Sequence, residues 1–160
     1  MDVGQSTVIR WALRIVEFTR RKKEGVESMG NRRSEIRIMV VDDESDVTLF
    51  CKTVLEYYGF VVDTFNESKE VLSSFISNSY DLIILDIRMP DMDGFELYRE
   101  IKVKDPNVRV CFLTASDRFY QEFRSRGCST FDKELFIQKP IENEELIEKI
   151  KRLISKYSSS

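Results

Sequence analysis

The stretch that decides the fold is LIILDIRMPDMDGFEL, at residues 82–97. Its first residues form the most apolar strand pattern in the chain and do not alternate between apolar and polar side chains. A strand without alternation is typical of the middle of a parallel sheet, where helices cover both faces. The strand pattern ends at Asp86, a loop containing Pro90 follows, and a helix is expected at 94–104. This stretch therefore predicts an α/β domain with a carboxylate at the end of a central strand.

Strand and helix patterns continue to alternate outward from this stretch in both directions. Short β-branched or aromatic runs predict strands, and apolar residues at three- and four-residue spacing predict helices. The expected strands are 36–41, 60–65, 81–85, 108–113 and 135–138, and the expected helices are 45–58, 68–76, 94–104, 117–125 and 142–157. Five strands that alternate with five helices predict a parallel sheet with right-handed crossovers.

Polar side chains stand at the ends of four of these strands. Asp42 and Asp43 follow the first strand, Asp86 ends the third, Thr114 ends the fourth and Lys139 ends the fifth. In open parallel sheets the ligand site lies at the carboxyl ends of the strands. We therefore expect these five residues to converge on one rim of the sheet.

Three carboxylates at one point repel each other unless a cation is present. With no Cys or His nearby, the site offers only oxygen ligands, which suit a hard ion such as Mg²⁺. The Lys139 ammonium can pair with a phosphoryl oxygen or with Asp86, and the Thr114 hydroxyl can donate a hydrogen bond. Asp86 can act as a nucleophile and form an aspartyl phosphate. The rim therefore predicts Mg²⁺-assisted phosphoryl chemistry.

Four strings in this order carry a resemblance to a known family: VVDDE at 40–44, LIILDIRMPDMDGFEL at 82–97, FLTAS at 112–116 and FIQKP at 136–140. Each string alone is weak, but together, on the correct strand ends, they are highly specific. Residues 36–157 resemble the response regulator receiver domain (CheY-like) of two-component signalling. The resemblance implies a doubly wound, flavodoxin-like (βα)5 sandwich with a five-stranded parallel sheet in the order 2-1-3-4-5.

The resemblance also implies a role for each residue of the rim. Asp86 would be the phosphoacceptor, and Asp43 and Asp86 would ligate Mg²⁺ directly. Asp42 would act mainly through water, and the backbone carbonyl of Arg88 would complete the protein ligands. The side chain of Arg88 and that of Ser116 would tune the lifetime of the phosphoryl group, Arg88 by shielding it from water.

A conformational switch is implied as well. Thr114 and Lys139 would be the switch pair, and Phe136 matches the aromatic switch position on the fifth strand. On phosphorylation Thr114 would move toward the phosphoryl group and Phe136 would swing inward. The face formed by 117–125, 135–138 and 142–157 would then change and be read by a partner. A plain core role for Phe136 is an equally good interpretation.

The resemblance implies a phosphoryl donor and a downstream partner, and it disfavours some other functions. The donor would be a sensor histidine kinase or a phosphotransfer protein of a phosphorelay, and the output would go to an unknown downstream protein. Because only a three-serine tail, 158–160, follows the last helix, we expect a single-domain response regulator. It would catalyse only its own phosphoryl transfer and slow autodephosphorylation. An interaction module that is never phosphorylated remains an alternative. A haloacid dehalogenase-type hydrolase is disfavoured because that class needs an acid where Arg88 stands.

The composition of the chain limits the remaining functional classes. Residues 1–35 carry eight Lys/Arg and five Asp/Glu, a net of +3, and the rest carry 17 and 23, a net of −6. The mildly acidic domain predicts no direct DNA binding. The chain has no histidine, which excludes a phosphohistidine relay within it. No apolar stretch is long enough to span a membrane, and three widely spaced cysteines (Cys51, Cys111 and Cys128) indicate free thiols, so we expect a cytoplasmic protein.

Four local features leave expectations to test. The basic extension, 1–35, is interpreted as a disordered tail or an upstream start before Met29, with an amphipathic helix at 8–18 as the alternative. The aromatic residues of the 117–125 helix are expected to be core at two of the positions Phe119, Tyr120 and Phe123. The Lys139-Pro140 bond is a candidate for the cis form, which would aim Lys139 inward. The stretch 126–134 is longer than usual for the family.

Overall fold

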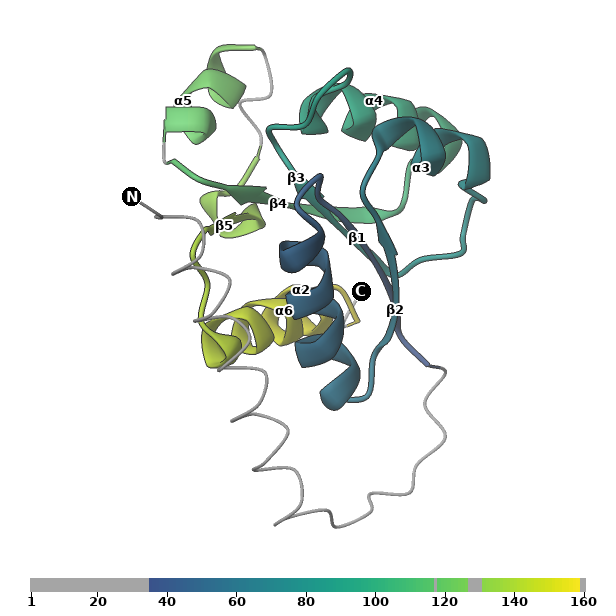
Figure 1. Ribbon diagram of the computed structural model, residues 1–160, viewed down its shortest axis with the longest axis vertical. Helices are drawn as coiled ribbons and strands as arrows, with labels where there is room; N and C mark the ends of the chain where they lie inside the picture. Colours follow the sequence, from purple (N-terminus) through teal and green to yellow (C-terminus); the bar gives the residue numbers. More distant parts are fainter. Residues whose placement is uncertain (1–34, 117, 127–130, 159–160) are drawn as a thin grey trace, which may run out of the picture.

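The computed structural model describes residues 35–116, 118–126 and 131–158. Its sheet is parallel throughout, with the order β2-β1-β3-β4-β5 (Figure 1). The strands are β1 (Arg37–Val41), β2 (Val61–Phe65), β3 (Leu82–Asp86), β4 (Arg109–Thr114) and β5 (Phe136–Gln138). The helices are α2 (Ser45–Tyr57), α3 (Ser68–Ser74), α4 (Gly94–Lys104), α5 (Arg118–Ser125) and α6 (Asn143–Ser158), with a 3-10 turn, η1, at Lys133–Leu135. The expected fold and strand order are confirmed.

Helices cover both faces of the sheet, as Figure 1 shows: α2 and α6 on one face, α3 and α4 on the other. Successive residues of a strand point to opposite faces, so each inner strand contributes to two cores. Ile84 of β3, for example, packs with α2 and α6, whereas its neighbour Leu85 packs toward α3 and α4. All five residues of β3 are buried. This double burial explains why the β3 sequence shows no alternation.

Most boundaries differ from the expectation by one residue, and two of the differences have a clear local cause. Leu135 belongs to η1 rather than to the fifth strand, because the Asp132 side chain accepts a hydrogen bond from the Glu134 N–H and turns the chain there. Pairing with β4 begins only at Phe136, opposite Phe112. The third helix ends at Ser74 instead of residue 76 because the backbone becomes extended at the next residue. Short caps and turns of this kind leave no periodic signal in the sequence.

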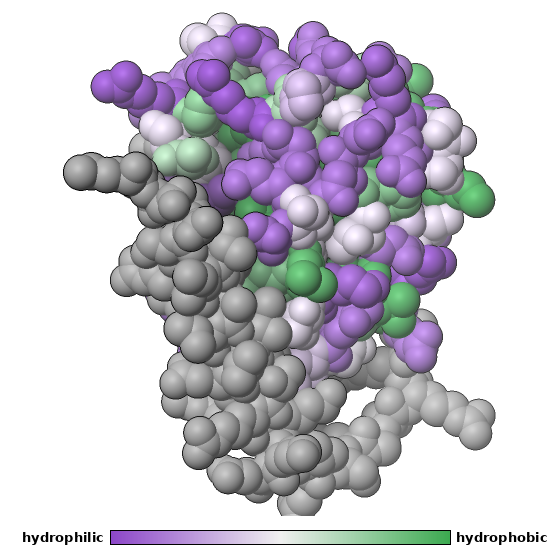
Figure 2. Space-filling model, viewed as in Figure 1, coloured by the Kyte–Doolittle hydropathy of each residue, from purple (hydrophilic) through white to green (hydrophobic). Residues whose placement is uncertain are grey.

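The expectation of two core aromatics in α5 is wrong, because only one of the three is fully buried. Phe123 is buried and stacks on Phe95 of α4, with ring centroids 4.2 Å apart. Phe119 and Tyr120 are half-buried at the edge of the same core. Hydrophilic side chains cover most of the described surface in Figure 2. No helix of the described part is long and apolar enough to cross a bilayer.

Several expectations fall on residues that the structure does not describe. These are the extension before Glu35, Cys128 and, within the stretch 126–134, residues 127–130. Cys51 and Cys111 are free thiols, and both are buried. The Lys139-Pro140 bond is cis, as expected.

Candidate functional site

The carboxyl end of β1 places Asp42 at the rim in a fully buried position. The Asp42 N–H donates to the Phe65 carbonyl at 3.1 Å, which continues the pairing with β2 by one residue. One Asp42 carboxylate oxygen accepts the Glu44 N–H at 2.9 Å. The Asn66 side chain donates to the Asp42 carbonyl at 2.7 Å. Asp42 is therefore fixed by its backbone on both sides, whereas Asp43 is exposed.

The carboxyl end of β3 places Asp86 beside it. The Ile87 N–H donates to the Leu113 carbonyl at 3.1 Å, and the Ile87 carbonyl accepts the Gly94 N–H at 2.9 Å. A Cβ atom at Gly94 would collide with the Asp86 carbonyl oxygen, so the start of α4 packs directly on the end of β3. Asp93 caps α4, and its side chain accepts the N–H groups of the second and third helical residues at 2.9 Å each.

The structure brings the three carboxylates together. Asp42, Asp43 and Asp86 each offer an oxygen, and these atoms all lie within 4.8 Å of one another. Burial, followed by the negative charge of Asp42, raises the pKa of Asp86 to about 7, against the opposing charge of Lys139. Burial likewise raises the pKa of Asp42. Such a site gains from a cation, and its all-oxygen donor set fits a hard divalent ion.

Lys139 supplies one positive charge to this cluster. Its Nζ lies 2.6 Å from Asp42 Oδ2, 3.3 Å from Asp86 Oδ1 and 3.3 Å from Glu44 Oε1. Its backbone N–H donates to the Thr114 carbonyl at 2.7 Å, which ties the end of β5 to that of β4. Burial alone would lower the pKa of Lys139, but the hydrogen bond to Asp42 and the three carboxylate charges raise it above the usual value. Glu44 was not among the site residues predicted from the sequence, although it is the third acidic residue of VVDDE.

Thr114 is buried at the end of β4 and is engaged with the loop that follows. Its hydroxyl donates to the Ser116 carbonyl at 2.7 Å and accepts the Ser116 N–H at 3.1 Å. Phe136 is buried and stacks on Phe112 with centroids 5.4 Å apart, while Tyr120 packs edge-on against it at 5.2 Å. In this state Phe136 already lies in the core. Its expected inward swing, and the movement of Thr114, stay predictions.

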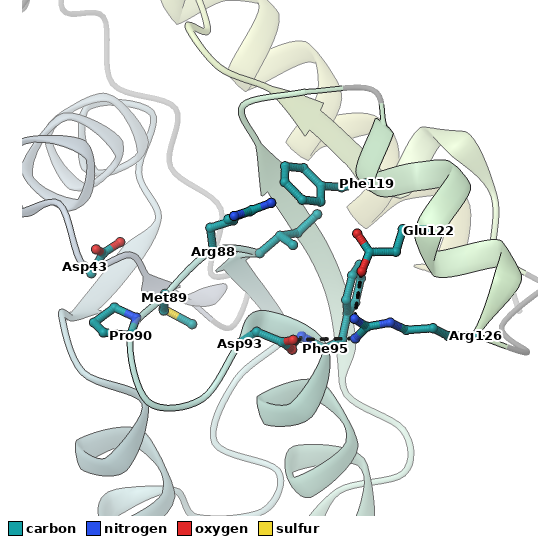
Figure 3. A pocket seen from close by; sticks show the side chains of 10 residues that line it. Asp43, Arg88, Met89, Pro90, Asp93, Phe95, Phe119, Glu122 and Arg126 are labelled. Carbon is teal, nitrogen blue, oxygen red and sulfur yellow. Dashed lines mark hydrogen bonds and ion pairs between the residues drawn. The ribbon is translucent and has the colours of Figure 1, made fainter.

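Arg88 is exposed, and its guanidinium stacks over the ring of Phe119 in α5, 4.6 Å from the centroid (Figure 3). The sequence placed Arg88 two residues after Asp86 but gave no partner for its side chain. The contact joins the loop after β3 to the first turn of α5.

With this geometry established, comparison with known proteins decides the family. Residues 38–151 match the family described as the response regulator receiver domain. The chain belongs to this family. The response regulator SaeR of Staphylococcus aureus is 32% identical to the receiver domain over 119 residues, which is 74% of this chain and 50% of SaeR. The chain thus spans about half the length of the curated relatives it matches.

Solved structures agree with the assignment. The response regulator TrrA of Thermotoga maritima, in complex with Mg²⁺-BeF, has 36% identity and a TM-score of 0.63, and the match covers 74% of this receiver chain and 98% of TrrA. The non-phosphorylated HemR receiver domain of Leptospira biflexa has 30% identity and a TM-score of 0.64, over 76% and 95% of the two chains. The chemotaxis protein CheY4 of Vibrio cholerae, at 22% identity and a TM-score of 0.61 over 74% and 98%, shares the fold.

Proposed function

We propose that this receiver domain accepts a phosphoryl group on Asp86 in a Mg²⁺-dependent reaction. One observation carries the proposal: the ends of three separate strands bring Asp42, Asp43, Asp86 and Lys139 into one cluster, in which Asp42 and Asp86 are buried and Asp43 is exposed. Capping of α2 would need one acidic residue at most. Three carboxylates with a lysine match what phosphoryl transfer requires, namely a nucleophile, metal ligands and a counter-charge.

The proposed metal ligands are Asp43, Asp86 and the backbone carbonyl of Arg88, with Asp42 acting mainly through water. A bound Mg²⁺ would neutralise the cluster and orient phosphoryl oxygens. The raised pKa of Asp86 supports this assignment, because a cation beside the carboxylate favours its charged, nucleophilic form.

In the proposed transfer, an Asp86 carboxylate oxygen attacks the phosphorus of the donor, and the bond between phosphorus and the leaving group breaks. The Lys139 ammonium, already 3.3 Å from Asp86, would pair with a phosphoryl oxygen. The Thr114 hydroxyl would leave the Ser116 carbonyl and donate to another phosphoryl oxygen. The reaction is self-modification, followed by slow autodephosphorylation.

The proposed donor is a sensor histidine kinase or a phosphotransfer protein, as is typical for the receiver family to which the chain belongs. The chain has no histidine of its own to carry the phosphoryl group. The proposed output surface is the α5–β5–α6 face, which carries Thr114, Tyr120 and Phe136 around one cleft. The curated relatives are about twice as long as the region they share with this chain, so the proposal concerns the receiver domain alone. We propose that the signal leaves this domain through contacts with another protein.

The proposal is tested by incubating the protein with acetyl phosphate and Mg²⁺ and measuring its intact mass. We expect a mass increase equal to one phosphoryl group that disappears when EDTA replaces Mg²⁺ and when Asp86 is changed to Asn. A wild-type protein that stays unmodified would refute the proposal and favour an interaction module that works without phosphorylation.

The output surface is tested separately by hydrogen exchange with and without beryllium fluoride and Mg²⁺. We expect slower exchange in α5, β5 and the first turns of α6 when both are added. An effect confined to the loops that carry Asp43 and Asp86 would contradict the proposed output face.

A further inference from the structure

A cleft of about 390 Å³ opens beside the phosphoryl site, between the loop after β3 and helix α5 (Figure 3). Its lining includes Asp43, Arg88, Phe95, Phe119, Glu122 and Arg126. Because Asp43 belongs to the carboxylate cluster, this cleft borders the reaction site. The side chain of Asp86 itself is only 6% exposed. Water that attacks a phosphoryl group on Asp86 therefore has this cleft as an approach.

One wall of the cleft is the pair formed by Arg88 and Phe119. The guanidinium lies over the ring face, where the negative π-electron density attracts it. Within the part of the chain that the structure describes, no carboxylate forms an ion pair with Arg88. The contact with the Phe119 ring therefore fixes the direction of the Arg88 side chain.

The backbone of Phe119 is linked to Thr114 of the reaction site through two hydrogen bonds. Its N–H donates to the Ser116 carbonyl at 3.3 Å, and the same carbonyl accepts the Thr114 hydroxyl at 2.7 Å. The turn that carries the ring thus depends on the position of Thr114.

The other end of α5 is tied to the start of α4. Arg126, the residue that follows α5, lies 3.5 Å from Asp93, which caps α4, and 2.7 Å from Glu122 of α5. The start of α5 is thus bonded to the turn at Ser116, and the residue that follows its end is paired with Asp93 across the cleft. These contacts hold the helix that places the Phe119 ring over Arg88.

We propose that Phe119 is a positioning residue for Arg88 and that the pair sets the lifetime of the phosphoryl group by narrowing the approach of water. This inference rests on the proposed phosphorylation of Asp86. In the step it slows, a water oxygen attacks phosphorus and the bond between phosphorus and the Asp86 oxygen breaks. The products are the Asp86 carboxylate and inorganic phosphate, which takes up the water's oxygen, and the released proton goes to solvent.

The test measures how fast the phosphoryl group is lost. The wild-type protein and the variants Phe119→Tyr, Phe119→Leu and Phe119→Ala are loaded with acetyl phosphate and Mg²⁺, freed of donor and followed by intact mass. We expect the Leu and Ala variants to lose the group about two- to fivefold faster, the factor that corresponds to an exposed cation–π contact. Phe119→Tyr keeps an aromatic face and should retain the wild-type rate.

A second set in the Arg88→Ala background separates positioning from packing. There the same Phe119 substitutions should have no further effect, because no guanidinium remains to be positioned. Thermal unfolding of every variant checks folding, and Leu preserves most of the apolar volume if Ala proves unstable.

Four results would overturn the inference. Equal lifetimes in the wild-type, Leu and Ala proteins would show that the ring has no influence. If the Ala variant loses the phosphoryl group faster than wild type but the Leu variant does not, the effect comes from packing and not from the aromatic face. If the Phe119 substitutions still change the rate of loss in the Arg88→Ala background, the effect likewise does not act through Arg88. If the wild-type protein takes up no phosphoryl group at all, the proposed function fails, and the inference falls with it.

Discussion

Burial makes the carboxylate of Asp86 unusual among the acidic residues of this domain. It sits 3.3 Å from one ammonium but shares its site with two further carboxylates, so the charged form is poorly compensated in the metal-free protein. Its pKa of about 7 means that a proton and a metal ion compete for the same oxygen atoms near neutral pH. Burial raises the pKa of Asp42 as well, so this carboxylate also favours binding a proton or a cation.

This competition predicts how stability depends on pH in the absence of metal. The pKa of Asp86 is higher in the folded protein than the ordinary value of about 3.9 in the unfolded chain. The folded state therefore binds the proton more tightly, and stability from this group is lost as the pH rises from about 4 to 7. With EDTA present, Asp86→Asn should raise the free energy of unfolding at pH 8 by up to a few kcal/mol, and by much less at pH 5. Urea unfolding at both pH values measures this difference, and an equal effect at both would contradict the account.

Gly94 is required for a steric reason at the same site. An alanine there would collide with the Asp86 carbonyl, so we expect Gly94→Ala to lower the free energy of unfolding by about 1–3 kcal/mol and to slow phosphorylation. Gly59→Ala is the matched control, because its φ of +90° disfavours a side chain but no atom lies within 4 Å. It should cost stability yet leave the acetyl phosphate reaction unchanged. A Gly94→Ala protein that reacts at the wild-type rate would contradict the close packing of α4 on Asp86.

At the scale of elements, the apolar patterns were enough to place every strand and helix of the described part. They placed the five rim residues as well, because parallel strands bring their carboxyl ends to one edge. What the sequence did not predict depends on caps and on loop conformation: the η1 turn at 133–135, the approach of Glu44 to Lys139, and the stacking of Arg88 on Phe119. The two side-chain contacts join residues far apart in sequence, and the cap of η1 joins residues only two apart, so none of the three follows a helix or strand period.

The α4 cap shows how one such contact links elements. Asp93 accepts two N–H groups of α4 and also lies near Arg126 of the α5 region. We expect Asp93→Ala to cost about 1–2 kcal/mol of unfolding free energy, since capping residues are typically worth this much. Lys69→Ala is the comparison, because its exposed pair with Asp91 should contribute less than about 1 kcal/mol. Equal losses in the two variants would argue against a special role for the cap.

At the scale of the whole molecule, the two hydrophobic cores define a candidate folding unit. Both cores of the described part consist of residues between Ile36 and Ile154. We propose 36–157 as the folding unit, with 1–35 as an extension and 158–160 as a tail.

This division predicts that a chain beginning at Met29 unfolds at the same urea concentration as the full chain and reacts equally fast with acetyl phosphate. A chain that begins after β1 should fail to fold, since that strand pairs with both β2 and β3. A clear loss of stability in the chain that begins at Met29 would show that the extension belongs to the folded domain.

The most direct test of the central claim is to locate the phosphoryl group. The protein is treated with acetyl phosphate and Mg²⁺, reduced with borohydride to convert an aspartyl phosphate into homoserine, digested and sequenced by mass spectrometry. The account predicts homoserine at position 86, and none at positions 42 or 43. Homoserine at either of those positions, or at no aspartate, would contradict the assignment of Asp86 as the acceptor.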